Sequence, residues 1–223
     1  MSKLLTLILI AAGSYLAGNI NPAIIIGKLY GIDIRKEGSG NAGMTNTIRV
    51  IGLWAGISVF VIDVMKAFVS VKLGTIIAGD VTGGMVAFAA VVIGHCYPVF
   101  YGFKGGKGVA ASLGAALALN WQSALSAAAV AAVVFLISGK RMSVASIVAV
   151  ITYPAFVYIF THDLRILIFS VAAVLFLIIQ HAANIKRIAK GEEDALTIGH
   201  KEQMHNTAED NSDESKKEEG TKK

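Results

Sequence analysis

Apolar stretches separated by short polar segments fill the chain up to about residue 181. A helix needs about 20 apolar residues to cross the hydrocarbon core of a bilayer. Seven stretches approach that requirement, namely 4–27, 50–72, 82–101, 108–119, 123–138, 143–160 and 164–181. Because the fourth and fifth are short, residues 108–138 can instead form one bent or re-entrant hairpin, whose turn must be shielded by protein or reach the interface.

Lysine and arginine are unevenly shared among the connecting segments, and this predicts the orientation. Short loops rich in these residues stay in the cytoplasm. Basic segments alternate with segments that hold few basic residues, in step with seven spans. The basic segments are 28–49, 101–107, 140–141 and 186–190. We therefore predict an all-α integral membrane protein with seven transmembrane helices, the N-terminus outside and the C-terminus in the cytoplasm.

The composition agrees with a membrane protein. Of 223 residues, 55% are hydrophobic and only 16% are charged, and the mean hydropathy is +0.64, which excludes an ordinary soluble domain of this size. No small-residue cleavage site follows the first apolar stretch, so we assign it as a span and not as a signal peptide. Residues 1–193 form the predicted membrane domain. Residues 194–223 are predicted to be a disordered, charged cytoplasmic tail, because 200–223 lacks periodic apolar positions.

A glycine-rich motif, residues 38–49, closes the first basic segment and contains the G-x-G-x-x-G pattern of dinucleotide-binding loops. That interpretation requires a strand before the motif and a βαβ unit around it, whereas here the motif joins two membrane helices. Glycines still let backbone N–H groups approach an anion, and Arg49 can bind the same anion bidentately. A ligand-free turn is the alternative. The other candidate ligand groups are Ser39, Gly40, Asn41, Gly43, Thr45 and Asn46.

A second motif lies on the same predicted face and leads into the fourth helix. Two lysines and three glycines at a helix N-terminus suit a dianionic ligand, although the spacing of a P-loop is absent. A simple positive-inside anchor explains the lysines but not the glycines. The candidates are His95, Lys104, Gly105, Gly106, Lys107 and Gly108.

Polar residues at the end of the last span form a third candidate cluster. His181 and Asn184 are one helical turn apart, and Arg187 follows them. Ser143 is expected to cap the sixth helix or to donate to a ligand. Three anion-suited segments thus converge on one membrane face, which predicts a phosphorylated cytoplasmic ligand and a lipid partner.

We interpret the remaining charged and potentially reactive residues as structural. Asp63 and Lys66, spaced i and i+3 within a span, are expected to pair. Cys96 is expected to be a buried apolar group, since reactive thiols need a specific electropositive setting. His205 and Asp210 have an acid–base spacing used by many glycerolipid acyltransferases, but they lie in the predicted disordered tail. No cluster has metal-ligand spacing, so we predict no metal and no cofactor.

Together the three motifs resemble those of the bacterial acyl-phosphate:glycerol-3-phosphate acyltransferases, the PlsY family, over residues 1 to about 193. The motifs are G-S-G-N-A-G-M-T-N-T-I-R at 38–49, G-H-C-Y-P-V-F-Y-G-F-K-G-G-K-G-V-A at 94–110 and H-A-A-N-I-K-R at 181–187. The resemblance implies a plasma-membrane enzyme with its site on the cytoplasmic side. It implies acyl transfer from acyl-phosphate to the 1-hydroxyl of glycerol 3-phosphate, giving lysophosphatidic acid and phosphate for phospholipid biosynthesis. The implied partners are these substrates, membrane lipid and the peripheral enzyme that makes acyl-phosphate, with no nucleic acid.

The resemblance also implies residue roles. It places Ser39, Arg49, His181 and Asn184 in catalysis, and Glu192 at the position of a glutamate important for integrity. Ala111 and Ala182 depart from the family's usual threonine and arginine, which affects the expected third-motif contacts. The implied substrate-binding residues are Gly40, Asn41, Gly43, Thr45, Asn46, His95, Lys104, Gly105, Gly106, Lys107, Gly108, Ser143 and Arg187.

We expect direct transfer without an acyl-enzyme, with the phosphate of the donor taking the proton from the glycerol hydroxyl. The acyl chain is expected in a groove between helices that is open to lipid. One alternative makes Ser39 a nucleophile with His181 or His95 as its base. Another makes the protein a transporter of organic phosphates, although the candidate groups lie at one face instead of the bilayer midplane.

Overall fold

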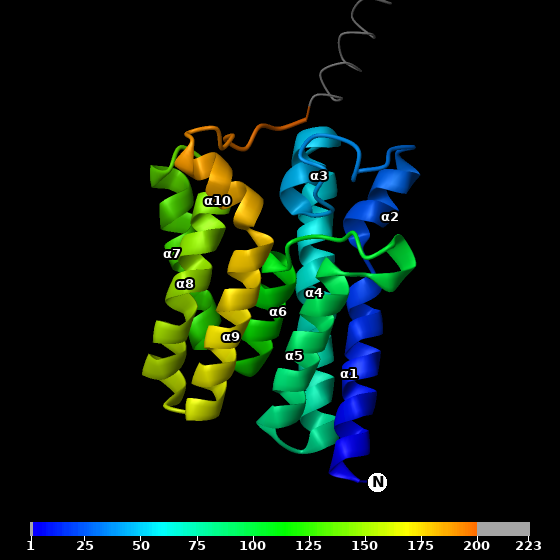
Figure 1. Cartoon of the computed structure of the whole chain (residues 1–223), viewed down its shortest axis with the longest axis vertical. Helices are drawn as coiled ribbons and strands as arrows, with labels where there is room; N and C mark the ends of the chain where they lie inside the picture. The colour runs from blue at the N-terminus through cyan, green and yellow to red at the C-terminus, as the bar shows by residue number, and fades with distance from the viewer. Residues whose placement is uncertain (1, 200–223) are drawn as a thin grey trace, which may run out of the picture.

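The computed structural model describes residues 2–199, which form helices and loops without a β-strand (Figure 1). The longer helices run along the long axis of the molecule, and the short α2, α3 and α10 lie at one end, at the top of Figure 1, which we call the upper end. The helices are α1 (Lys3–Asn19), α2 (Pro22–Leu29), α3 (Met44–Val50), α4 (Leu53–Ala78), α5 (Val81–Cys96), the 3-10 helix η1 (Val99–Tyr101), α6 (Val109–Leu119), α7 (Trp121–Ile137), α8 (Met142–Thr161), α9 (Leu164–Gln180) and α10 (Ala182–Ala189).

Each predicted span overlaps a helix, but the boundaries differ in three places. The predicted span 4–27 is broken after α1, because Asn21 caps a new helix through the Ile24 N–H and Pro22 occupies its first position. Helix α4 continues to Ala78, beyond the predicted end at residue 72. Helix α3 lies inside the segment that the sequence predicted to be a loop.

Four helical stretches in residues 2–199 are long and apolar enough to cross a membrane, and α9 with α10 makes a fifth that is bent by 63°. The four are Lys3–Leu29, Leu53–Ala78, Val81–Tyr101 and Met142–Thr161. Helix α6 has 11 residues, so it is about 16 Å long at 1.5 Å per residue, roughly half of the hydrocarbon thickness. The seven-span arrangement therefore stays a prediction.

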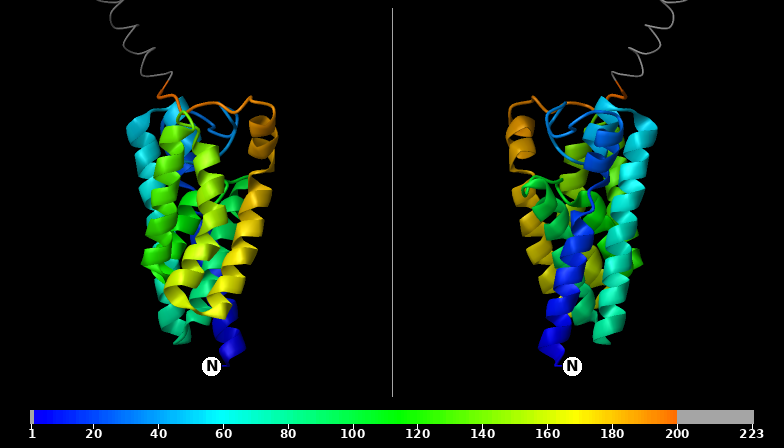
Figure 2. Two further views of the ribbon diagram at one scale, coloured as in Figure 1. Left: turned by 90° about the vertical axis from the view of Figure 1, so that its left-hand side faces the viewer. Right: turned by 90° about the vertical axis from the view of Figure 1, so that its right-hand side faces the viewer.

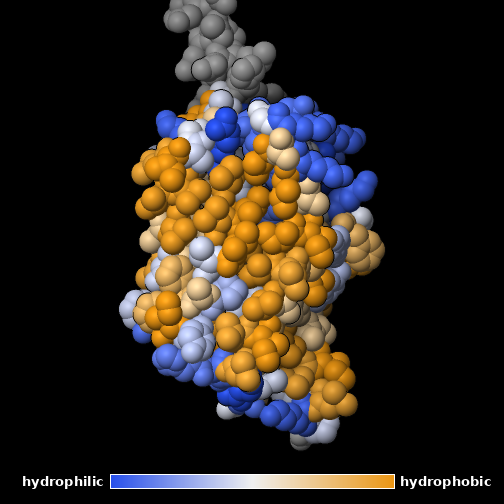
Figure 3. Space-filling model, turned by 60° about the vertical axis from the view of Figure 1, so that its left-hand side comes forward, coloured by the Kyte–Doolittle hydropathy of each residue, from blue (hydrophilic) through white to orange (hydrophobic). Residues whose placement is uncertain are grey.

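The outer surface of the bundle is apolar in its middle. Figure 3 shows hydrophobic residues over most of the central part of one face and hydrophilic residues toward both ends. Large side chains such as Trp54, Ile76 and Ile137 are more than two-thirds exposed on this bundle. A contiguous apolar surface of this kind is covered by lipid in a membrane protein.

The helices form two packed groups. In the first group α1 packs against α5, and α4 packs against α5 and α6; in the second group α8 packs between α7 and α9 (Figures 1 and 2). Fewer contacts join the groups, mainly where α7 follows α6 at Asn120 and where α5 meets α9. Two cavities lie along this boundary.

Close helix contact in the first group depends on glycine. A Cβ atom at Gly18 of α1 would overlap the carbonyl oxygen of Val91 and lie 2.9 Å from Cα of Gly94, and one at Gly94 would overlap the carbonyl oxygen of Tyr15. Small residues allow the two backbones to approach closely. In lipid, helices associate through such van der Waals packing, because there is no hydrophobic driving force between them. The contact sets the position of His95, the next residue on α5.

The predicted pairing of Asp63 and Lys66 is confirmed, with 2.7 Å between Nζ and Oδ1. Lys66 also donates to the carbonyl oxygens of Gly18 and Ile20, at 3.1 and 2.6 Å. These carbonyls are released where α1 ends, and a helix end in an apolar environment needs such partners. Cys96 is buried, as predicted.

We predict that Gly18→Ala lowers the midpoint of thermal unfolding in detergent by about 3–10 °C, because an added methyl group must push α1 away from α5. The matched control is Gly13→Ala, on the same helix, where a Cβ atom meets nothing within 4 Å. Alanine favours the helix over glycine, so this control should leave the midpoint unchanged or raise it slightly. An equal loss in both variants would contradict the packing argument.

Candidate active site

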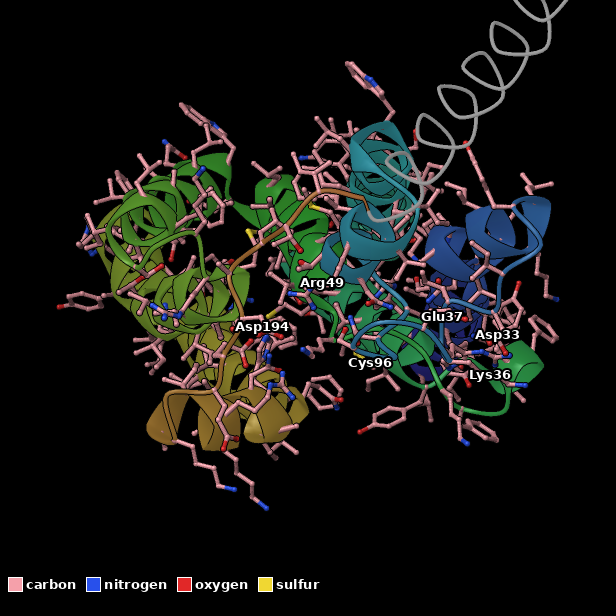
Figure 4. All side chains as sticks on the ribbon, turned by 90° about the horizontal axis from the view of Figure 1, so that it is seen from above. Asp33, Lys36, Glu37, Arg49, Cys96 and Asp194 are labelled. Atoms are coloured by element: carbon pink, nitrogen blue, oxygen red, sulfur yellow. The ribbon has the colours of Figure 1, made fainter. Side chains whose placement is uncertain are left out.

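A polar cavity of about 140 Å³ opens at the upper end between the two helix groups. Figure 4 looks down on this end, with Arg49 of α3 and Asp194 near the middle of the view. The structure thus brings parts of all three sequence motifs to one cavity. The polar side chains that line it are those of Ser39, Asn41, Thr45, Asn46, Arg49, Asp63, His95, Lys107, Ser143, Ser146, His181, Asn184, Arg187, Glu193 and Asp194.

Asn46 organises the first motif from within. Its Oδ1 accepts the N–H of Ser39 at 2.8 Å, and its Nδ2 donates to the carbonyl oxygens of Ile34 and Glu37, both at 3.0 Å. The sequence suggested Asn46 as a ligand donor, but its amide hydrogen bonds are used by the loop. Gly40 likewise donates its N–H to Glu37 and does not line the cavity.

Three polar side chains of this motif remain available at the cavity. Within the described residues, no hydrogen bond engages the side chains of Ser39, Asn41 or Thr45. The N-cap of α3 is Gly43, which also lines the cavity. Arg49 follows in the last turn of α3, and its Nη2 donates to the carbonyl oxygen of Ala195 at 3.4 Å.

The second motif contributes less directly than the sequence suggested. Lys107 and Gly108 line the cavity, whereas Lys104 is exposed outside it. The N–H groups of Gly105 and Gly106 donate to the carbonyls of Cys96 and His95. A Cβ atom at Gly106 would overlap Nε2 of His95. These two glycines therefore allow the loop to fold onto α5, and their N–H groups do not face a ligand.

His95 is fixed beneath the cavity. Its Nδ1 lies 3.2 Å from Oδ1 of Asp63 and 3.1 Å from Nζ of Lys66. The ring lines the cavity and is 2% exposed. The buried Asp63–Lys66 pair thereby reaches the site through one imidazole.

The third motif lies across a helix bend. His181 lies at the bend: it is the C-cap of α9 and the N-cap of α10, which continues at 63° to α9, and Asn184 follows one turn later on α10, as the sequence suggested. Nδ1 of His181 lies 2.7 Å from the carbonyl oxygen of Leu177. A carbonyl only accepts, so Nδ1 carries the proton and Nε2 stays available to the cavity. The Oδ1 atom of Asn184 is buried without a partner in the described residues.

Glu193 joins the residues of the second helix group. Its Oε1 accepts from the hydroxyl of Ser143 and from Nδ2 of Asn184, and its Oε2 accepts from Nε of Arg187 at 2.7 Å. Ser143 therefore does not cap α8, whose N-cap is Arg141. The sequence pointed to the neighbouring Glu192, which is exposed. Two adjacent glutamates carry no local signal that distinguishes the inward one.

The charges of the cavity shift the pKa values of two groups. Burial is the main reason that the pKa of Lys107 falls to about 8, and the charges of Arg187 and Arg49 lower it further, against the opposing effect of Glu193. Burial alone raises the pKa of Glu193, but hydrogen bonds from Ser143, Arg187 and Asn184 outweigh it and hold the pKa below its ordinary 4.5. The cavity thus gathers cations that an anion can neutralise.

Residues 192–199, which we call the strap, cross the upper end over the cavity (Figure 2). Leu196 N–H donates to the carbonyl oxygen of Lys140 at 2.9 Å, and Gly199 N–H donates to that of Ile48 at 3.1 Å. The strap thereby joins both helix groups, and the disorder of residues 194–223 stays a prediction. The proposed pair of His205 and Asp210 lies outside the described residues.

An apolar cavity of about 340 Å³ continues from the polar one. Both are lined by Phe60, Val109, Met142 and Ser146, and the apolar cavity extends between α6, α7, α8 and α9. Much of its wall is alanine. In residues 2–199, no group of three or more His, Cys, Asp or Glu side chains is placed to hold a metal ion.

Comparisons with known proteins point to one family. The family model described as glycerol-3-phosphate acyltransferase matches residues 8–191. The chain is 42% identical over 190 residues to the glycerol-3-phosphate acyltransferase of Thermoanaerobacter sp. (strain X514), covering 85% of this chain and 95% of the relative. It is 39% identical over 199 residues to that of Clostridioides difficile (strain 630), covering 86% and 96%.

A solved structure has the same fold. The crystal structure of PlsY (YgiH), an integral membrane glycerol 3-phosphate acyltransferase, in its glycerol 3-phosphate form, superposes with a TM-score of 0.79 at 34% identity. The match covers 86% of this chain and 96% of that chain. The lysophosphatidic acid form of PlsY gives a TM-score of 0.77.

We predict that Glu193→Ala destabilises the folded protein by about 2–4 kcal/mol at pH 7, since it leaves Ser143, Asn184 and Arg187 without their shared acceptor. Thermal unfolding in detergent measures the loss, and Glu192→Ala, one residue away, should cost almost nothing. Because folding lowers the pKa of Glu193, its stabilisation is present above about pH 4.5 and disappears as the pH falls through the lowered value. Equal effects of the two alanine variants would contradict the assignment.

Proposed function

The chain belongs to the glycerol-3-phosphate acyltransferase family, and on that premise we propose that it transfers a fatty acyl group from acyl-phosphate to the 1-hydroxyl of glycerol 3-phosphate. The products are lysophosphatidic acid and inorganic phosphate, and the reaction serves phospholipid biosynthesis. The main support is that a polar cavity lined by cationic side chains adjoins an apolar cavity and shares lining residues with it. Such a site suits a phosphorylated head and a hydrocarbon chain at once.

We propose that the protein crosses the plasma membrane seven times, with the upper end in the cytoplasm. Basic residues cluster at that end, and the positive-inside rule assigns such clusters to the cytoplasmic side. Residues 1–193 form the membrane domain in this proposal, and the cytoplasmic tail begins beyond the strap. The clustered basic residues are Lys28, Arg35, Lys36, Lys140, Arg141, Lys186 and Lys190.

In our proposal the phosphate of glycerol 3-phosphate binds between Arg49 and Lys107. These two cations come from α3 and from the loop before α6, and both line the polar cavity. His181 offers Nε2 to a glycerol hydroxyl, and Asn184 orients neighbouring groups through its unpartnered Oδ1. Lys104 has no part in this arrangement because it lies outside the cavity. Arg187 and Ser143 act through Glu193, which holds both.

The acyl-phosphate has its phosphate at Ser39 and its chain in the apolar cavity, which leads toward lipid. The 1-hydroxyl oxygen of glycerol 3-phosphate attacks the carbonyl carbon, the bond from that carbon to the phosphate oxygen breaks, and the leaving phosphate takes the hydroxyl proton. Acyl-phosphate is a mixed anhydride with a good leaving group. The enzyme therefore needs chiefly to position two anions and to stabilise the charge that develops on the carbonyl.

Direct transfer is favoured over an acyl-Ser39 intermediate. A serine nucleophile needs a base within about 2.6–3.2 Å, and within residues 2–199 no hydrogen bond joins Ser39 to a histidine. Nδ1 of His95 faces Asp63 and Lys66, and Nδ1 of His181 faces a backbone carbonyl. In residues 2–199 neither imidazole therefore forms the hydrogen bond to Ser39 that an acyl-enzyme mechanism uses.

The deciding experiment supplies purified protein in lipid with labelled glycerol 3-phosphate and either acyl-phosphate or acyl-CoA. We expect lysophosphatidic acid with acyl-phosphate alone. Product only with acyl-CoA would preserve acyl transfer to glycerol 3-phosphate and refute the proposed donor. If folded protein gives no product but carries glycerol 3-phosphate into proteoliposomes, the transporter interpretation replaces the proposal.

We predict that the KM for glycerol 3-phosphate rises above about pH 8, because Lys107 loses its proton there. The phosphate is already dianionic above its second pKa of about 6, so the substrate does not cause the change. Lys107→Arg keeps the charge and should hold the KM flat between pH 8 and 9, whereas Lys104→Ala should follow the wild-type curve. Steady-state kinetics from pH 6.5 to 9 measure this. A pH-independent wild-type KM would contradict the assigned contact.

A further inference from the structure

The apolar cavity ends at Tyr153 of α8, and we propose that Tyr153 limits the acyl chain length that the enzyme accepts. The inference rests on the proposed function, because it takes the apolar cavity as the acyl site. It assigns a specificity-determining residue that none of the three sequence motifs contains.

Two antiparallel helices give the cavity its length. On α8 the lining residues run from Met142, beside the polar cavity, to Tyr153, and on α7 they run from Phe135 to Ala124. Each run covers 12 residues, which are 11 steps of about 1.5 Å, or about 16 Å along a helix axis. Because the two runs have the same length and lie on facing helices, they form one channel between α7 and α8 that leads away from the polar cavity.

The channel is closed beyond Tyr153. Val157, one turn further on the same face of α8, is fully buried. On α7, the residue one turn below Ala124 is Asn120, a polar residue at the N-cap of the helix, whose Oδ1 accepts the hydroxyl of Ser123 at 2.6 Å. A chain that reaches Tyr153 therefore finds no continuation along either wall.

Between its ends the channel is lined by small side chains that impose little restriction. Five alanines of α7 face it, together with Ala145 and Ala149 of α8. Large side chains lie at the mouth, such as Phe60 and Phe135, or belong to the packed core, as Phe88 does through its edge contact with Phe169. The aromatic ring at the far end is that of Tyr153. The five alanines are Ala124, Ala127, Ala128, Ala131 and Ala132.

The channel length corresponds to a definite number of carbons. A fully extended chain advances about 3.3–3.6 Å for every three backbone bonds, or roughly 1.2 Å per bond. A channel of about 16 Å thus holds an extended saturated chain of about 14 carbons. Longer chains must fold back or leave the channel sideways.

The limit is steric. The hydroxyl oxygen of Tyr153 is buried and has no hydrogen-bond partner among the described residues, so the cost of its desolvation is present whether or not a chain fills the channel. A chain of more than about 14 carbons meets the ring and must displace it or bend, and packed side chains resist such displacement.

The test is an internal competition in one vesicle preparation. Saturated acyl-phosphates of 8, 10, 12, 14, 16 and 18 carbons are mixed at equal mole fraction with full-length protein and glycerol 3-phosphate, and the lysophosphatidic acids are separated by mass. Product ratios are independent of how much protein is active. Wild type should form the 14-carbon product about tenfold faster than the 18-carbon product, the lower end of the discrimination that a hydrophobic pocket shows against an extra methylene group.

Three variants separate the contributions. Tyr153→Phe keeps the ring and should retain the wild-type preference for 14 over 18 carbons. Tyr153→Ala removes the ring and should move the optimum to 16–18 carbons. Ala149→Leu fills the channel one turn, or about 6 Å, above Tyr153, and should move the optimum down by about five carbons. The matched control Tyr158→Ala lies on the same helix but is 61% exposed, and it should reproduce wild-type ratios.

The outcomes test the channel assignment and the acyltransferase proposal separately. Wild-type ratios in both Tyr153→Ala and Ala149→Leu overturn the channel assignment while leaving the acyltransferase proposal intact. A flat wild-type profile from 8 to 18 carbons does the same. No product from any chain length, with folded protein, refutes the proposed donor and with it the acyl assignment of the cavity.

Discussion

The ammonium group of Lys66 is the interaction on which the upper half of the structure depends. It pairs with Asp63, contacts His95 and donates hydrogen bonds to two carbonyl oxygens of the α1–α2 break. A broken helix and a carboxylate are each unfavourable inside an apolar bundle, since neither finds water there. Their combination around one cation satisfies both. It also fixes the imidazole onto which the loop before α6 folds.

The candidate site follows from the boundary between two helix groups. The first group supplies Ser39, Arg49 and Lys107, and the second supplies His181 and Glu193 with the side chains that Glu193 holds. Each group is internally packed, and the strap joins them across the cavity. In the proposed arrangement the first group binds the phosphates of both substrates and the second group contributes His181 and Asn184, so the geometry of the site is set by how the groups meet.

The helices and the convergence of the motifs could be predicted from sequence. Hydropathy indicates which segments lie in lipid, and the charge of the loops indicates on which side of the membrane each loop lies. The inward glutamate could not, since Glu192 and Glu193 differ only in the direction that the chain takes after α10. The role of Asn46 depends on how residues 34–39 fold back over it. Helix α3 and the strap are held by contacts with residues distant in the sequence. Neither segment is long enough to show the periodic apolar pattern from which a helix is predicted.

The alanine wall of the apolar cavity changes the energetics of occupancy. In water, entry of a hydrocarbon chain into such a space gains free energy from each methylene removed from solvent. A chain already dissolved in a bilayer has no such gain, because lipid tails are as apolar as the wall. Under the proposed function, loading of the enzyme is then a transfer of the chain between two apolar environments. Affinity for chains must accordingly come from shape and from the phosphorylated head, and release of product is a partition step and not an escape into solvent.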